Sequence, residues 1–265
     1  MEKSDQKIDE GRAFDFGRIS SDYAKYRDIY PEEFYQKIVC RSLCVKGQKV
    51  LDLGTGTGVL PRNMIRFGAS WTGTDISREQ IEEARRLSSL TGIAYYVMPA
   101  EKLDFPMESF DVITACQCFF YFDYEKVIPE LHRLLKPKGK LLILYMAWLP
   151  EEDEIAGRSE ELVLKYNPVW KGAGEYRHPI AVPEIAGRYF SLIDREEYDV
   201  RIPFTRSSWH GRMRACRGTG ASLNAEDLAA WEKDHLHLLE TTAPEEFEIL
   251  HYCALAVLEK KEIEP

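Results

Sequence analysis

The first half of the chain alternates short apolar runs with helical patterns, and this alternation constrains the fold more than any other feature. Apolar strands that alternate with helices are typical of a parallel sheet covered on both faces. We expect a helix between the second and third strands, because Ser77 and Gln80 have capping-box spacing and Gly92 stands where a helix ends. The expected strands are KVLDLG, ASWTGTDI, AYYVMP, SFDVITA and GKLLILYM, at residues 49–54, 69–76, 94–99, 109–115 and 139–146. We therefore predict a doubly wound α/β fold.

The turn after the first strand carries three glycines, Gly54, Gly56 and Gly58. In doubly wound sheets the ligand lies beyond the carboxyl ends of the strands, and the first strand-to-helix turn cradles it. The G-x-G-x-x-G fingerprint of nicotinamide enzymes needs glycine where this chain has Val59, so a nicotinamide oxidoreductase is the less favoured alternative. The spacing G-x-G-x-G after Asp52 favours a ligand without a pyrophosphate.

Composition restricts the class of partner. The chain has 265 residues with 45% hydrophobic and 30% charged residues, which is typical of a globular protein with a sizeable core. A net charge of -9 argues against nucleic acid and favours a small-molecule substrate. No apolar run is long enough to span a membrane, the N-terminus lacks a signal-peptide core, and six scattered cysteines do not resemble a disulfide scaffold. We therefore expect a cytoplasmic protein; the sequence gives no indication of its oligomeric state.

Four blocks occur in order along residues 49–145: VLDLGTGTG, GTDIS, AEKLDFPMESFDVITACQCFFYFD and LLKPKGKLLIL. Together they resemble the motif series of class I S-adenosylmethionine-dependent methyltransferases. More narrowly, YAKYRDIYP and ESFDVITACQCFFYFD resemble the branch of trans-aconitate-type methyltransferases. That branch often carries His-Trp where this chain has Phe120 and Tyr121. The resemblance implies a Rossmann-like sheet, mostly parallel with an antiparallel last strand, and S-adenosyl-L-methionine as cofactor, with S-adenosyl-L-homocysteine as product.

The resemblance also implies roles for individual residues. The glycines would let the backbone pass close to the cofactor, and Asp52 would reach its ammonium group. Asp75 would accept hydrogen bonds from both ribose hydroxyls, and Ile76 would pack on the adenine. The cofactor-binding residues implied in this way are Tyr23, Arg27, Asp52, Gly54, Gly56, Gly58, Asp75, Ile76, Ala100, Glu101 and Gln117.

Each of these residues also has a structural alternative. The glycines can form a tight packing turn without a ligand, and Asp75 can cap the helix that follows it. Glu101 can be simply exposed. Tyr23 and Arg27 share one helical face and can close the pocket or form a surface stripe. Asp111 opens the fourth strand, where we expect it to serve the edge of the sheet.

The second half of the chain begins with a helical insertion rich in charges and aromatics, which we expect to cover the substrate. Four arginines follow within residues 206–217, and an arginine fork binds carboxylates well, so a carboxylate-bearing acceptor is the candidate class. The alternative is a helix paired with the abundant acidic residues. No pattern identifies a catalytic base; His178, His210 and Tyr121 are candidates by type only. The substrate-binding candidates are Tyr121, Trp209, His210, Arg212 and Arg217.

The predicted organisation has four parts. Residues 1–47 form a helical cap over the cofactor, 48–147 the cofactor-binding core, 148–194 the substrate cover, and 195–265 the strands and helices that complete the sheet. The predicted function is methyl transfer to a small molecule. The alternatives are a cofactor-binding relative without catalysis, and a metalloid or thiol methyltransferase in which Cys116, Cys118 and Cys216 converge. We predict no metal site, because no C-x-x-C pair is present.

Overall fold

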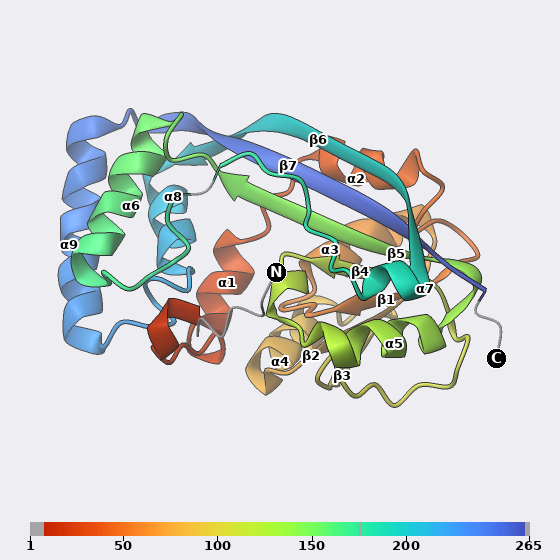
Figure 1. The fold of residues 1–265 in the computed structure, drawn as a ribbon. Coiled ribbons are helices and arrows are strands. Elements are labelled where there is room, and N and C mark those ends of the chain that lie inside the picture. The colour runs from red at the N-terminus through yellow and green to blue at the C-terminus, as the bar shows by residue number, and fades with distance from the viewer. Residues whose placement is uncertain (1–7, 175, 263–265) are drawn as a thin grey trace. The chain divides into compact units, whose positions relative to one another are not determined.

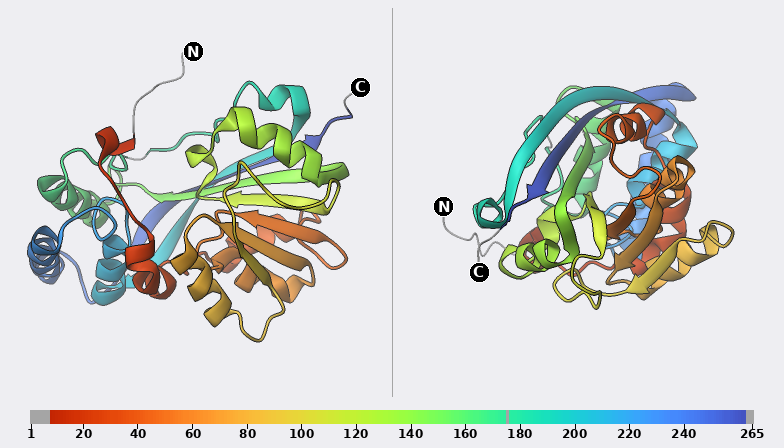
Figure 2. Two further views of the ribbon diagram at one scale, coloured as in Figure 1. Left: turned by 90° about the horizontal axis from the view of Figure 1, so that it is seen from below. Right: turned by 90° about the vertical axis from the view of Figure 1, so that its right-hand side faces the viewer.

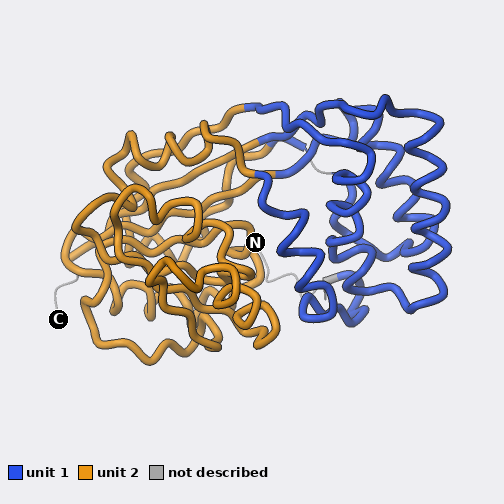
Figure 3. Tube along the Cα trace, turned by 180° about the vertical axis from the view of Figure 1, so that it is seen from behind, with its two compact units in different colours: residues 1–29, 147–177, 199–252 blue, residues 30–146, 178–198, 253–265 orange. Residues whose placement is uncertain are grey.

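The structure, a computed structural model, describes residues 8–174 and 176–262, and the chain divides into two compact units (Figure 3). Unit 1 comprises residues 1–29, 147–177 and 199–252, and unit 2 comprises residues 30–146, 178–198 and 253–265. The first seven residues of the predicted cap and Glu175 of the predicted cover lie outside the described residues.

Unit 2 contains the parallel part of the sheet. β1 (Lys49–Leu53) pairs in parallel with β2 (Ser70–Asp75) and with β4 (Phe110–Cys116), and β2 pairs with β3 (Ala94–Val97). The register places Asp52 beside Gly73 on one side and beside Thr114 on the other. β1 is buried almost throughout, as expected for a central strand covered on both faces.

Three longer strands complete the sheet, in the order β3-β2-β1-β4-β5-β7-β6. β5 (Leu135–Trp148) is parallel to β4, whereas β7 (Glu246–Lys260) is antiparallel to both of its neighbours, β5 and β6 (Phe190–Thr205) (Figure 1). All three strands pass from one unit into the other along the chain. The five expected strands are present as β1 to β5, and the predicted antiparallel completion of the sheet is confirmed.

Helices cover both faces of the parallel strands in unit 2. α3 (Val59–Met64) and α4 (Arg78–Leu87) lie on one face and α5 (Tyr124–Leu134) on the other (Figure 2). Right-handed crossovers require this arrangement, because the chain moves in opposite directions along the sheet from β1 to β3 and from β4 to β5. The predicted cap of α4 is present, since Ser77 Oγ accepts from the Gln80 N–H at 3.3 Å. α2 (Glu32–Val39), α7 (Ala186–Tyr189) and the short 3-10 helices η3 (Ile65–Phe67) and η4 (Phe119–Tyr121) complete the unit.

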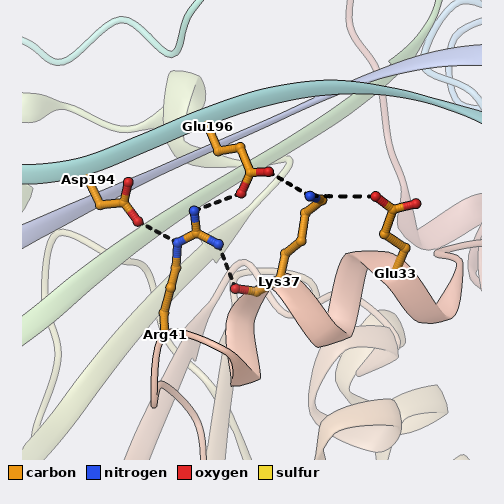
Figure 4. A network of polar contacts seen from close by, with 5 residues as sticks. All are labelled: Glu33, Lys37, Arg41, Asp194 and Glu196. Atoms are coloured by element: carbon orange, nitrogen blue, oxygen red, sulfur yellow. Dashed lines mark hydrogen bonds and ion pairs between the residues drawn. The ribbon is translucent and has the colours of Figure 1, made fainter.

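A network of ion pairs joins α2 to β6 within unit 2 (Figure 4). Lys37 Nζ lies 2.6 Å from Glu196 and 3.5 Å from Glu33, while Arg41 contacts Asp194 at 2.5 Å and Glu196 at 2.7 Å. β6 is one of the two edge strands of the sheet, and its charged side chains oppose pairing with another chain.

Unit 1 consists of helices together with the parts of β5, β6 and β7 that lie within residues 147–177 and 199–252. Its helices are η1 (Ile8–Gly11), η2 (Gly17–Ile19), α1 (Ser20–Tyr26), α6 (Glu154–Tyr166), α8 (Arg206–Arg214) and α9 (Ala225–Thr242). Side chains cap the longer ones: Asp153 accepts from Ala156 N–H, Thr205 from Ser208 N–H, and Asn224 from Asp227 N–H. None of the described helices is long and apolar enough to cross a membrane.

Candidate cofactor site

The glycine turn adopts a backbone that side chains disfavour. Gly54, Gly56 and Gly58 have φ values of 54°, 56° and 75°, all in the left-handed region. Thr55 and Thr57 alternate with them, and the Thr57 hydroxyl is buried with no hydrogen-bond partner among the described residues. A buried hydroxyl without a partner is costly in a folded protein and therefore calls for an explanation.

Two of the glycines also make room for neighbouring side chains. A Cβ at Gly54 would lie 2.8 Å from Cβ of Cys118, and one at Gly58 would lie 2.3 Å from the hydroxyl oxygen of Tyr95. Tyr95 packs against Gly73 as well, since a Cβ there would lie 2.7 Å from Cδ1 of the ring. Part of the glycine requirement therefore comes from packing inside unit 2.

Asp52 is buried at the end of β1, with an exposed fraction of 2%. Thr114 Oγ1 donates a 2.6 Å hydrogen bond to its carboxylate. Burial raises the pKa of Asp52 to about 7, although hydrogen bonds from threonine hydroxyls oppose this shift. The sequence patterns did not single out Thr114; a threonine inside the apolar run SFDVITA was the available signal.

Asp75 ends β2 on the same edge of the sheet. One carboxylate oxygen accepts from Gly56 N–H and the other from Ser77 N–H, both at 2.9 Å. Burial raises the pKa of Asp75, and these backbone hydrogen bonds oppose the shift. The predicted alternative of a helix cap is thus partly realised, since Asp75 binds the N–H of the residue that caps α4. Ile76 follows with 77% of its surface exposed, which leaves an apolar side chain beside the carboxylate.

The loop after β3 carries the other predicted adenine contacts. Ala100 is buried, and Glu101 accepts a 3.1 Å hydrogen bond from Asp123 N–H at the start of α5. Asp123 in turn caps that helix through Glu125 N–H. Glu101 therefore has a structural role in fixing the loop to α5.

The segment after β4 lies at the carboxyl edge beside the glycine turn. Gln117 has φ 66°, unusual for a residue with a side chain, and is held by its N–H to Leu144 O at 3.0 Å and by its side-chain amide to Met146 O. Cys118 donates to Leu53 O at 3.1 Å, and burial raises the pKa of its thiol. Cys116 contacts the Tyr30 hydroxyl at 3.4 Å. Gln117 is thus clamped to β5 through both its main chain and its side chain.

Tyr121 lies in η4, where its ring contacts Phe120 with centroids 4.3 Å apart. Phe120 is half exposed.

Tyr23 and Arg27 belong to unit 1, so they are described apart from the residues above. The Arg27 guanidinium stacks on the Tyr23 ring at 4.5 Å and donates to Ala215 O at 3.4 Å. Their predicted common face is thus observed. Their contribution to cofactor binding stays a prediction.

The remaining substrate candidates, also in unit 1, have partners within it. Trp209 is fully buried and donates to Ser159 Oγ at 3.0 Å, and His210 lies 2.9 Å from His235. Arg212 is buried over the Trp148 ring at 4.7 Å. Arg217 forms an ion pair with the buried Asp9 at 2.7 Å. These contacts match the structural alternative of paired arginines more closely than an open clamp.

The cysteines do not form a recognisable metal centre. Within residues 8–174 and 176–262, no group of three or more His, Cys, Asp or Glu side chains has the geometry to hold a metal ion. Cys216 is buried in unit 1 and accepts from Arg212 at 3.0 Å, whereas Cys116 and Cys118 belong to unit 2.

Comparison with known proteins identifies the part of the chain that relatives share. Residues 51–143 match a family model described as Methyltransferase domain. Methyltransferase phqN of Penicillium fellutanum is 32% identical over 146 residues, covering 52% of this chain and 44% of that protein. The ubiquinone biosynthesis O-methyltransferase of Pseudomonas aeruginosa is 32% identical over 143 residues, covering 52% of this chain and 61% of that protein.

A solved structure extends the similarity to nearly the whole fold. Phospholethanolamine N-methyltransferase 2 of Haemonchus contortus, in complex with phosphomonomethylethanolamine and S-adenosylhomocysteine, has a TM-score of 0.55 and 19% identity. The match covers 97% of this chain and 58% of that one, and at this identity it concerns the fold. This chain spans about half the length of the curated relatives named above.

Proposed function

We propose that this chain, which belongs to the class I S-adenosylmethionine-dependent methyltransferases, transfers a methyl group from S-adenosyl-L-methionine to a small-molecule acceptor. The observation that carries the proposal is the carboxylate of Asp75 at the end of β2. Each of its oxygens accepts one backbone N–H, from Gly56 and from Ser77. The Ile76 N–H also interacts with this carboxylate, which has about four acceptor positions, so acceptor capacity remains for a further donor. Two vicinal ribose hydroxyls match that arrangement.

The neighbouring residues fit the same cofactor. The exposed Ile76 supplies an apolar surface for a purine ring, and the buried Thr57 hydroxyl lacks a partner among the described residues. Asp52 adds a second acid at the adjacent strand end, where it favours a cationic ligand when ionised. A ligand with adjacent hydroxyls, a purine and positive charge satisfies these groups together.

The cofactor supplies an activated methyl group on a sulfonium centre, and transfer is an in-line displacement. Positioning the acceptor about 3 Å from the methyl group and excluding water account for much of the rate in such reactions. In this chain, Asp75 would orient the ribose, and the clamped Gln117 would give the edge after β4 a fixed shape. A carboxylate or thiolate acceptor needs no general base, which accords with the absence of an identified base in the sequence.

We further propose that the acceptor is a small molecule that carries a carboxylate. The net charge of -9 favours a small molecule over a nucleic acid. A carboxylate-bearing acceptor rests on the arginines of residues 206–217, of which Arg214 pairs with Asp22 and Glu232 and Arg217 pairs with Asp9. If Arg212 binds the acceptor, Arg212→Lys will raise the acceptor KM at least tenfold with little change in cofactor Kd. Equal changes in both constants would contradict a role in acceptor binding.

Calorimetry with S-adenosylhomocysteine and, separately, NAD tests the cofactor. We expect binding of the first and none of the second; the opposite result would refute the proposal. Incubation with labelled S-adenosylmethionine and panels of carboxylates, phenols and thiols then tests transfer. Binding without transfer to any acceptor would favour a protein that binds the cofactor and lacks catalysis.

A ribose analogue tests Asp75 without depending on the stability of a variant. Each hydrogen bond from a hydroxyl to a buried carboxylate contributes about 1.5–3 kcal/mol, which is about 10- to 150-fold in affinity. The wild-type protein should therefore bind S-adenosylhomocysteine at least tenfold more tightly than its 2′-deoxy analogue. Asp75→Asn should reduce this ratio, whereas Asp111→Asn should preserve it, since Asp111 binds Lys49 N–H and Lys136 at the other end of β4. A wild-type ratio near one would exclude the proposed role.

A further inference from the structure

Two histidines of unit 1 face each other through the same type of nitrogen. His210 on α8 and His235 on α9 place their Nδ1 atoms 2.9 Å apart, within hydrogen-bonding distance. His235 is fully buried, and His210 is partly buried. The indole of Trp231 stacks on both, with ring centroids 5.4 Å from His210 and 4.8 Å from His235. The two imidazoles are therefore held in register between two helices.

The surrounding contacts assign the protons. Ser159 Oγ on α6 donates to Ile155 O at 2.7 Å and accepts the Trp209 indole N–H at 3.0 Å. Its single proton is thus committed, so Nε2 of His235, 3.1 Å away, must donate to it. A neutral His235 then has a lone pair on Nδ1, and His210 donates its Nδ1 proton to that lone pair.

The pair accommodates one added proton but not two. A first proton can enter at Nε2 of His210, which leaves the Nδ1 hydrogen bond intact. A second proton would have to enter at Nδ1 of His235, so that two N–H groups would point at each other across 2.9 Å. This conclusion holds for either direction of the shared hydrogen bond, because a doubly protonated pair carries a proton on both Nδ1 atoms.

Nearby charged groups modify this behaviour without removing it. On α9, Glu232 is the acidic group that favours protonation of His210, but it is paired with Arg214 of α8. Arg214 also pairs with Asp22 of α1. On α6, the carboxylate of Glu160 is bound to the Trp148 indole and to Gly174 N–H. Asp234 on α9 pairs with Lys165 and Tyr166 of α6. Burial lowers the pKa of His210 and lowers that of His235 to about 3.

We propose that His210 and His235 form a proton-operated latch on the helical layer of α6, α8 and α9, closed while the pair holds at most one added proton and opened when both imidazoles become protonated. Of these helices, α6 belongs to the segment 148–194 that we expect to cover the substrate. The latch would make opening of that cover depend on pH in the mildly acidic range, which is a property separate from methyl transfer.

Hydrogen exchange measures the opening. In the open state each imidazole has an ordinary pKa near 6.5. Its protonation therefore favours the open state about 30-fold more at pH 5 than at pH 8. Opening should therefore increase by about 30-fold if the closed pair takes one proton freely and by about 1,000-fold if it takes none. We expect the protection factors of α8 and α9 amides, corrected for intrinsic exchange, to be lower at pH 5 than at pH 8 by a factor within this range. Amides of α4 in unit 2 serve as the internal reference.

Matched variants isolate the latch. His210→Gln combined with His235→Gln should reduce the pH dependence to less than about threefold, because no titrating pair remains. His237→Gln, at an exposed histidine of the same helix, should behave as the wild-type protein, and the buried His251 on β7 stays unchanged in all variants. An unchanged pH dependence in the double variant would overturn the proposal.

A second measurement covers the case in which the double variant does not fold. Nitrogen-15 spectra of the wild-type imidazoles should show one proton shared between the two Nδ1 atoms at pH 8 and uptake of one further proton by the closed pair. If both histidines titrate independently near pH 6.5 while α8 and α9 amides stay protected, the latch does not exist.

Discussion

Gly58→Ala should destabilise unit 2 strongly, because two separate effects act at this position. Gly58 has φ 75°, and a left-handed backbone costs a residue with a Cβ about 1–2 kcal/mol. The new Cβ would also lie 2.3 Å from the Tyr95 hydroxyl oxygen and 2.9 Å from the ring carbon Cζ that carries it. Overpacking of this kind costs about 1–3 kcal/mol, so the expected total is about 2–5 kcal/mol.

Tyr95 has little freedom to relieve the contact. Its ring is buried, its hydroxyl lies 3.0 Å from Ser88 Oγ, and Gly73 receives the other part of the ring. Gly92→Ala is the matched control, because Gly92 has φ 73° and a Cβ added there would have no neighbouring atom within 4 Å. That variant should lose only the backbone contribution of about 1–2 kcal/mol.

Native-state hydrogen exchange of β1 and β2 amides gives the free energy of opening of unit 2 in each variant. In a Tyr95→Ala background the additional cost of Gly58→Ala should fall to that of Gly92→Ala, because the ring is absent. Equal costs for Gly58→Ala with and without the tyrosine would refute the packing argument.

Two further changes test the electrostatics of unit 2. Asp52→Asn should leave stability unchanged near pH 4 and increase it by about 2–4 kcal/mol at pH 8. The pKa of Asp52 is raised to about 7 in the folded state, so the wild-type protein loses stability as the pH rises from about 4 to 7. Thermal melts of both proteins at the two pH values measure this difference. Glu196→Gln removes the partner of Lys37 and Arg41 and should cost about 1 kcal/mol at low salt and less in 1 M NaCl. Glu83→Gln, in the exposed pair with Arg86, should cost less than Glu196→Gln at either salt concentration, and urea titrations compare the two variants.

The sheet was predictable because its signals are local. Each of the five expected strands contains a short apolar run bounded by polar or turn residues, and the α4 cap formed by Ser77 has the spacing typical of a helix N-terminus. Asp75 was equally accessible, since its position after β2 follows from the end of the apolar run. Its hydrogen bond from the Gly56 N–H was not predictable, because that donor belongs to the turn after β1, 19 positions earlier in the sequence.

The side-chain contacts in the second half of the chain could not be predicted, because they join residues far apart in the sequence. The arginines of residues 206–217 are conspicuous in composition, yet Arg217 meets Asp9 and Arg214 meets Asp22, partners about two hundred positions away in sequence. Likewise, the His210–His235 contact follows from the packing of α8 on α9. Neither helix alone carries a pattern that indicates it.

The spacing of the glycines led to the prediction of a cofactor site. The Gly58 variant separates two reasons for a glycine there, packing inside unit 2 and close approach of the cofactor. At Gly54 and Gly58 the missing Cβ faces Cys118 and Tyr95, which belong to unit 2 itself. An added methyl group there would press on the protein and not on a ligand in front of the turn. We therefore expect folded Gly58→Ala to bind S-adenosylhomocysteine within about threefold of the wild-type affinity, less than 1 kcal/mol, despite its lower stability. A tenfold weaker affinity at wild-type stability would show instead that the third glycine is required by the cofactor.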